Sequence, residues 1–306
     1  MTAGARAGVS IKNFREPVMT IDQRIIDLYD DFTHSRLDRR AFLERLASLA
    51  GGTAAAMTIL PLLGPNYALG AMTAPDDSRL ETASITYKGA SGEVKAYRAK
   101  PKGAGKLPVV IVIHENRGSN PHIDDVTRRM ALEGFLAIAP DSLSPVGGTP
   151  PEQDKARDLF AKLDRDLTTR DHVALVSLMK KSPDGNGKVG AVGFCAGGTA
   201  VNQLAIHSAE LDAAVPYYGR VPEAADVAKI RAPILAHYGE RDPNVNAGIP
   251  GFEEALKKNN KKYTFHIYEG AQHSFNSDAS PDRYHKEAAT LAWQRTVDFF
   301  KQQLKS

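Results

Sequence analysis

Cysteine is almost absent from this chain, whose 306 residues include a single one, Cys195. One thiol excludes a disulfide within the chain, an all-cysteine zinc site and an iron–sulfur cluster held by one chain. A large charge excess is also lacking, since 39 Lys and Arg against 36 Asp and Glu leave a net charge of +3. That balance gives no basic stripe of the kind that binds nucleic acid. The glycines and prolines follow no repeat period, which excludes collagen-like and solenoid folds.

The first 75 residues differ in pattern from the rest of the chain. Residues 21–34 place apolar side chains at helical spacing. Arg39 and Arg40, followed by Phe-Leu and the uncharged stretch 46–63, resemble a twin-arginine export signal. Glycines and threonines in that stretch make it a poor membrane span, so no stable span is expected.

Two fates are therefore open for the segment 1–75. The first is a leader that the twin-arginine machinery exports, which would place the mature protein in the periplasm and its cleavage site near residues 69–75. The second is a retained pair of N-terminal helices in a cytoplasmic protein, packed on the main domain or on a partner chain. The pattern alone does not decide between them.

Residues 76–306 predict one α/β domain, because buried-type strands alternate with helices along the whole stretch. A hydrophobic fraction of 42% with 25% charged residues suits a globular domain. We expect a mostly parallel central sheet with helices on both faces. Strands are predicted at 83–88, 93–99, 108–114, 135–140, 188–194, 213–219, 233–239 and 263–269, and helices near 121–133, 152–181, 197–208, 251–260 and 282–304.

The only cysteine lies in a motif that changes how it is interpreted. Taken alone, a free cysteine is more often an inert buried residue than a reactive one. Here a buried strand runs directly into Gly193-Phe194-Cys195-Ala196-Gly197 and a helix follows. This is the nucleophile-elbow pattern of hydrolases, with cysteine in the place of serine. The start of the following helix favours a thiolate, so Cys195 is predicted to be a nucleophile.

A thiol nucleophile needs a base, and the base needs a residue that orients it. In hydrolases of this type the order along the chain is nucleophile, acid, histidine. Asp242 and His273 each follow a predicted strand downstream of Cys195, at the edge where open α/β sheets place their ligands. We assign Asp242 as the orienting acid and His273 as the general base. Glu240 is the nearest rival to Asp242.

A third group of candidates follows the strand 108–114. Acyl transfer needs two backbone N–H groups aimed at the developing oxyanion. We assign these to Ala196, directly after the nucleophile, and to Asn116 in the loop after this strand. Glu115 is open at this point: it is a functional acid beside the nucleophile or a solvated carboxylate at a strand end.

From about residue 80 to its end, the chain resembles the dienelactone hydrolase (carboxymethylenebutenolidase) family. The pieces that carry the resemblance occur in the family's order: HENRG, APDSLS, NGKVGAVGFCAGG, VPYYG and GAQHSF. The resemblance implies an α/β-hydrolase fold and a triad of Cys195, Asp242 and His273. It also implies that Glu115 contacts the resting thiol until substrate binding reorganises it. The family's reaction is hydrolysis of an unsaturated lactone through an acyl-thioester.

The chain departs from the family where the substrate binds. The family holds the lactone's carboxylate with arginines, one of them shortly after the histidine. Here no arginine follows His273 until Arg283, and Arg157 lies only near the position of the other. We name Arg117, Tyr218 and Arg220 as candidate substrate-binding residues instead.

These observations predict a hydrolase that cleaves an ester or a lactone, with no metal and no organic cofactor. Its partner is a small-molecule substrate rather than nucleic acid. One alternative keeps the triad and changes the substrate to a short-chain ester or a thioester. A second alternative is a binding or sensor protein that has the same fold without turnover.

Overall fold

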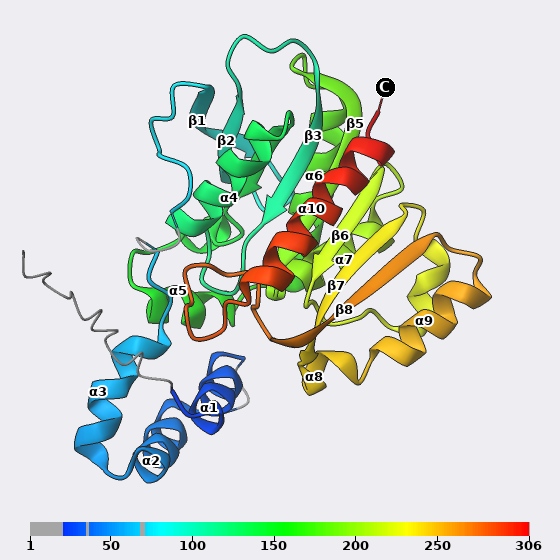
Figure 1. The fold of residues 1–306 in the computed structure, drawn as a ribbon. Coiled ribbons are helices and arrows are strands. Elements are labelled where there is room, and N and C mark those ends of the chain that lie inside the picture. Colours follow the sequence, from blue (N-terminus) through cyan, green and yellow to red (C-terminus); the bar gives the residue numbers. More distant parts are fainter. Residues whose placement is uncertain (1–20, 35–36, 68–70, 306) are drawn as a thin grey trace, which may run out of the picture.

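The computed structural model describes residues 21–34, 37–67 and 71–305, and its centre is an eight-stranded sheet (Figure 1). The strand order across the sheet is β1-β2-β4-β3-β5-β6-β7-β8. Pairs β1–β2 and β2–β4 are antiparallel, and the other pairs are parallel. The mostly parallel sheet is the one the sequence predicted. The strands are β1 (Leu80–Lys88), β2 (Glu93–Pro101), β3 (Leu107–Ile113), β4 (Leu136–Pro140), β5 (Gly185–Phe194), β6 (Ala213–Tyr217), β7 (Ile234–Arg241) and β8 (Tyr263–Gln272).

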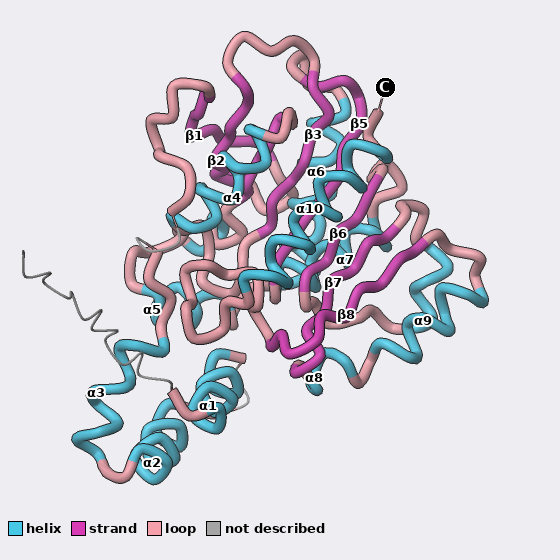
Figure 2. The backbone as a smooth tube through the Cα atoms, in the orientation of Figure 1, coloured by secondary structure: helices cyan, strands magenta, loops and turns pink. Residues whose placement is uncertain are grey.

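Helices cover both faces of this sheet, which explains why its central strand is an unbroken apolar run (Figure 2). Val110 and Val112 of β3 belong to a core shared with α4 and α10. Ile111 and Ile113 belong to a second core, shared with α6, α7 and α9. The helices of this domain are α4 (Pro121–Leu132), α5 (Gln153–Phe160), α6 (Arg165–Lys180), α7 (Ala196–His207), α8 (Pro243–Asn246), α9 (Ile249–Lys258) and α10 (Lys286–Gln303), with 3₁₀ turns η1 (Ser144–Val146) and η2 (Ala224–Lys229).

The helical pattern predicted over residues 152–181 divides into two helices, α5 and α6. The break lies at Asp164, whose side chain accepts a hydrogen bond from the Leu167 N–H at 2.9 Å and so caps α6. The break lets α5 turn toward the edge of the sheet where β5 ends, and this brings Arg157 and Phe160 to the site described below.

The N-terminal segment contains three helices, α1 (Gln23–Thr33), α2 (Arg39–Ala50) and α3 (Thr53–Leu63). They enclose a small core of their own, in which the rings of Phe32 and Phe42 stack at 4.4 Å. The two arginines of the export-like motif begin α2, which Asp38 caps by accepting from the Ala41 N–H. The predicted boundary near residue 75 falls between α3 and β1. Among the described residues, no helix is both long and apolar enough to cross a membrane.

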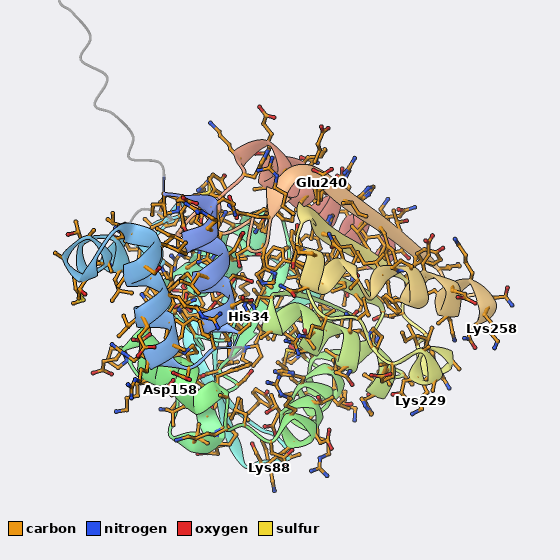
Figure 3. All side chains as sticks on the ribbon, turned by 90° about the horizontal axis from the view of Figure 1, so that it is seen from below. His34, Lys88, Asp158, Lys229, Glu240 and Lys258 are labelled. Carbon is orange, nitrogen blue, oxygen red and sulfur yellow. The ribbon has the colours of Figure 1, made fainter. Side chains whose placement is uncertain are left out.

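The three helices pack beside the end of the sheet at which β5 and β7 finish (Figure 1). Seen from that end, α1 lies across the catalytic domain with His34 near the middle of the view (Figure 3). The contacts that hold it there are polar as well as apolar. Arg117 Nη2 donates to the Tyr29 hydroxyl at 2.8 Å, and Asn116 Nδ2 donates to the Thr33 carbonyl at 2.8 Å.

Candidate active site

Cys195 sits on a strained turn between β5 and α7. Its φ of 55° and ψ of −113° lie in a region that non-glycine residues rarely adopt. Two glycines allow the turn to form. A Cβ on Gly193 would lie 2.2 Å from the Gly197 carbonyl oxygen, and one on Gly197 would lie 2.2 Å from the Ile113 carbonyl oxygen. The elbow is therefore built as the motif predicted, with the thiol at the start of a helix.

Asp242 and His273 meet beside the elbow. His273 Nδ1 donates to Asp242 Oδ2 at 2.6 Å, and both side chains are buried. Because a carboxylate accepts the hydrogen bond, Nδ1 carries the hydrogen, and Nε2 is left free for proton transfer. Nε2 is buried without a hydrogen-bond partner among the described residues, and a ring nitrogen of His273 lies within 4.8 Å of Cys195 Sγ. Glu240, the rival acid, is exposed and accepts from the Gly270 N–H instead.

His34, at the end of α1, is a site residue that the sequence did not identify. Its Nε2 lies 3.2 Å from Cys195 Sγ, and its ring packs edge-on against that of His273 with centroids 4.7 Å apart. Its Nδ1 lies 2.8 Å from the Asp30 carbonyl oxygen and 3.4 Å from the Asp30 carboxylate. The sequence shows Asp30 and His34 four residues apart on one helical turn, but it does not show what that turn faces.

The two imidazoles determine the acidity of the thiol. Burial raises the pKa of Cys195, but the positive charges of His34 and His273 and the hydrogen bond from His34 lower it by more, to about 6. Burial lowers the pKa of His273, while the Cys195 charge, Asp30 and the Asp242 hydrogen bond raise it well above its usual value. Burial likewise lowers the pKa of His34, but Cys195 and Asp30 leave it raised. The cluster therefore favours a thiolate beside imidazolium groups.

Of the three candidates around the predicted oxyanion position, two line the cavity and the third, Glu115, does not. Asn116 and Ala196 both line the cavity at Cys195, and neither backbone N–H donates to another described residue. They are free for the oxyanion role assigned to them. Glu115 is partly buried, and no hydrogen bond between its carboxylate and Cys195 is found in the described part of the chain. The contact with the resting thiol comes from His34 instead.

Only two of the three candidate substrate-binding residues line the cavity. Tyr218 lines the cavity with its ring 5.0 Å from that of His273, and burial with the nearby Glu115 charge raises its pKa well above the usual value. Arg220 lines the same cavity and is exposed. Arg117 is buried and turned toward Tyr29 of α1 rather than into the cavity.

A cavity of about 390 Å³ opens beside Cys195. Its wall combines the two parts of the chain, because Thr33 and His34 come from the N-terminal segment. Positive charge dominates this wall. The arginines that line it are Arg157, Arg165 and Arg220, and none of the described residues in its wall is a carboxylate. The cavity is therefore suited to a small substrate with a polar or anionic part.

Three side chains of the site also have the right types and distances to bind a metal ion. Ligand atoms of His34, Cys195 and His273 all lie within 4.8 Å of one another. The same groups are also a thiol with two neighbouring bases, and the 3.2 Å between His34 Nε2 and Cys195 Sγ is a hydrogen-bond distance that favours proton transfer over metal binding. Hydrolysis without a metal, as expected from the sequence, stays a prediction.

Comparison with known proteins gives consistent matches for the catalytic part. The family model described as "Dienelactone hydrolase family" matches residues 94–304, and one described as "YqhI-like" matches residues 13–52. An Escherichia coli protein named "Putative carboxymethylenebutenolidase" is 35% identical over 246 residues, covering 74% of this chain and 89% of that protein. A Saccharolobus solfataricus protein of the same name is 32% identical over 253 residues, covering 71% of this chain and 97% of that protein.

Solved structures agree with these sequence matches. A crystal structure described as a "Putative Dienelactone Hydrolase" from Klebsiella pneumoniae aligns with a TM-score of 0.66 at 31% identity. The alignment covers 73% of this chain and 99% of that one. The likeness therefore extends over the whole of that protein and leaves about a quarter of this chain outside it.

The acidity of the thiol predicts how fast it reacts at each pH. Because the thiolate is the reactive form, alkylation by iodoacetamide should rise with pH and level off above a midpoint near 6, against about 8.5 for an ordinary thiol. Mass spectrometry of protein quenched at intervals between pH 4.5 and 9 measures the rate. Label on a thiol can only be at Cys195, since the chain has no other cysteine, and peptide mapping separates it from label on other side chains. A midpoint above pH 8 would contradict the prediction.

Proposed function

Since this chain belongs to the dienelactone hydrolase family, whose members are hydrolases acting on esters or lactones, we propose that it works through Cys195, His273 and Asp242 by way of an acyl-thioester. The observation that carries the proposal is the placement of a strained elbow thiol beside an Asp–His pair at the wall of one cavity. The same arrangement of nucleophile, base and orienting acid occurs in hydrolases of unrelated folds.

In the first half of the reaction, the Cys195 thiolate attacks the substrate's carbonyl carbon. The carbonyl oxygen becomes an oxyanion, which the backbone N–H groups of Asn116 and Ala196 stabilise. The tetrahedral intermediate collapses when the carbon–oxygen bond of the ester breaks. The His273 imidazolium gives its Nε2 proton to the departing alkoxide, and Asp242 keeps the ring oriented.

In the second half, water cleaves the acyl-thioester. Neutral His273 takes a proton from the water as its oxygen attacks the carbonyl carbon, and the same N–H groups stabilise the second oxyanion. Breaking the carbon–sulfur bond releases the acid and restores the Cys195 thiolate. A lactone gives one product that carries both the acid and the hydroxyl, because its ring contains the ester bond.

The charge of the cavity favours a substrate that has an anionic group in addition to its ester. Arg165 and Arg220 line the cavity, and Arg220 faces solvent at its edge. Arg157 also lines it, but its guanidinium lies over the Phe32 ring at 4.2 Å and 3.1 Å from Asp158, so less of its charge is available. An arginine–carboxylate contact gives both affinity and orientation.

We further propose that the N-terminal segment remains attached to the active enzyme. Thr33 and His34 line the cavity, and Tyr29 and Thr33 bind side chains of the loop after β3. Cleavage near residues 69–75 would remove all of these contacts. Export through the twin-arginine route with cleavage of the leader stays the competing prediction.

Substitution Cys195→Ala should lower kcat/KM by at least about a thousandfold, because the nucleophile is lost. The melting temperature should change little, since the substitution deletes one sulfur atom. The control is His207→Ala, at the exposed far end of the same helix α7, which should keep activity. Esterase activity retained by Cys195→Ala would exclude the cysteine mechanism.

A substrate panel should separate the proposed anionic substrate from a neutral one. We expect kcat/KM for dienelactone-type lactones bearing a carboxylate to exceed that for neutral 4-nitrophenyl esters, and Arg220→Gln should reduce this preference about tenfold or more. Lys258→Gln removes an equally positive, exposed side chain far from the cavity and serves as the control. A uniform preference for neutral esters, unaffected by Arg220→Gln, would favour the short-chain carboxylesterase or thioesterase.

The length of the protein in cells tests whether the N-terminal segment is retained. Intact mass and N-terminal sequencing of protein isolated from expressing cells should place the first residue before α1. The full-length recombinant chain, treated in parallel, controls for proteolysis during isolation. A mature protein that begins near residues 69–75 would instead support export and cleavage.

A further inference from the structure

A second imidazole faces the nucleophile, and the mechanism above does not use it. His34 Nε2 is 3.2 Å from Cys195 Sγ, which is a direct hydrogen-bond distance for sulfur. Its Nδ1 is 2.8 Å from the Asp30 carbonyl oxygen, an atom that only accepts. Nδ1 therefore carries the hydrogen, and Nε2 is the nitrogen that can exchange a proton with the thiol.

The arrangement repeats the one around His273. In each case Nδ1 of a histidine that faces the same sulfur contacts an aspartate: for His273 it is the Asp242 carboxylate at 2.6 Å, and for His34 it is the Asp30 backbone carbonyl at 2.8 Å, with the Asp30 carboxylate at 3.4 Å. A residue that only closed the cavity would not need an oriented imidazole. The side chain of His34 is about 16% exposed, so its pairing with the sulfur is largely shielded from water.

We propose that His34 is a further catalytic residue of this site: its Nε2 takes the proton of the Cys195 thiol, and the resulting imidazolium holds the resting nucleophile as a thiolate. One proton moves from sulfur to nitrogen, so the total charge of the pair does not change. The inference rests on the proposed function, since it assigns a role within the same reaction.

The proposal divides two tasks between two histidines. The His34 imidazolium pairs with the Cys195 thiolate before the substrate binds. It pairs with the thiolate again when the acyl group leaves the sulfur. His273 takes its own proton from solvent, gives it to the departing alkoxide and recovers one from the attacking water.

The charged groups around the pair support this division. Positive charge from Arg117 on the β3 loop favours the thiolate. Negative charge on Asp30 favours both imidazolium groups. Tyr218 stays protonated because burial and the charges of Glu115 and Cys195 raise its pKa well above the usual value. Within the described part of the chain, the titratable and charged groups that face the pair are Asp30 on α1, Glu115 and Arg117 after β3, Tyr218 after β6, Asp242 after β7, His273 after β8, and Arg283 before α10, which lies 3.9 Å from the Asp30 carboxylate.

The test measures the pKa of Cys195 directly, in the full-length chain. His34→Gln keeps a side chain of similar length that cannot take up a proton, and His34→Ala removes the contact altogether. The control is Arg24→Gln, which removes a cation from the exposed opposite end of α1. Iodoacetamide alkylation is followed between pH 4.5 and 9, with EDTA present so that no metal ion masks the thiol. Melting temperatures show whether each variant is folded.

Both His34 variants should shift the alkylation midpoint upward by at least about one pH unit, which is a tenfold loss of thiolate at pH 5. Their kcat/KM should fall more at pH 5.5 than at pH 8, where solvent base ionises the thiol without His34. Arg24→Gln should match the wild type in both measurements. A midpoint unchanged in folded His34→Gln and His34→Ala overturns the proposal, and so does higher activity with an unchanged midpoint, which would mean that His34 only blocks the cavity.

The alkylation measurement keeps this inference separate from the proposed function, because it requires no ester substrate. If His34 controls the midpoint while no ester or lactone is hydrolysed, the proposed function fails and the pairing of His34 with the thiol stands. If Cys195→Ala abolishes hydrolysis while the His34 variants leave the midpoint unchanged, the function stands and the role of His34 fails.

Discussion

A thiolate buried in a protein requires positive charge close by, and this requirement shapes the whole site. Burial by itself would keep Cys195 protonated and unreactive. Two imidazoles reverse that effect. The Asp242 carboxylate orients His273, and the Asp30 backbone carbonyl orients His34, so that Nε2 of His34 faces the sulfur. The strained elbow then holds the sulfur at the cavity wall, where the free N–H groups of Asn116 and Ala196 also lie. Without either imidazole the elbow would still form, but the pKa of Cys195 would rise and less of the thiol would be ionised.

The N-terminal segment alters a site that the rest of the chain already contains. Tyr29 of α1 receives Arg117, and Phe32 lies under the Arg157 guanidinium. Arg283 is buried between Tyr29, at 5.6 Å from its ring, and Asp30. Three arginines close to the catalytic residues thus contact α1. The substrate is left with a cavity whose exposed positive charge comes from Arg165 and Arg220. The segment therefore affects both the surroundings of Cys195 and the charge of the cavity beside it.

The sequence revealed the parts of this arrangement that depend on local patterns. A buried strand, two glycines around Cys195 and a helix specify the elbow because sterics force those residues together. Asp242 and His273 could be placed because parallel strands end at one edge of a sheet. The sequence did not reveal His34, because its contact with Cys195 spans 161 positions and depends on how α1 docks. The packing of separate helices has no signature in local periodicity, and the same limit applies to Arg117, whose neighbours in sequence do not show that it faces Tyr29.

The single cysteine has a consequence for how the protein tolerates oxidants. A thiol that is ionised near pH 6 reacts readily with peroxide to give a sulfenic acid. Many enzymes recover by forming a disulfide with a neighbouring cysteine, but these 306 residues offer no second thiol. Recovery must then come from a small external thiol that reaches the sulfur through the cavity, past His34. Continued oxidation to the sulfinic acid would end activity permanently. The same low pKa that would make Cys195 a ready nucleophile thus makes its thiol depend on the reducing capacity of its surroundings.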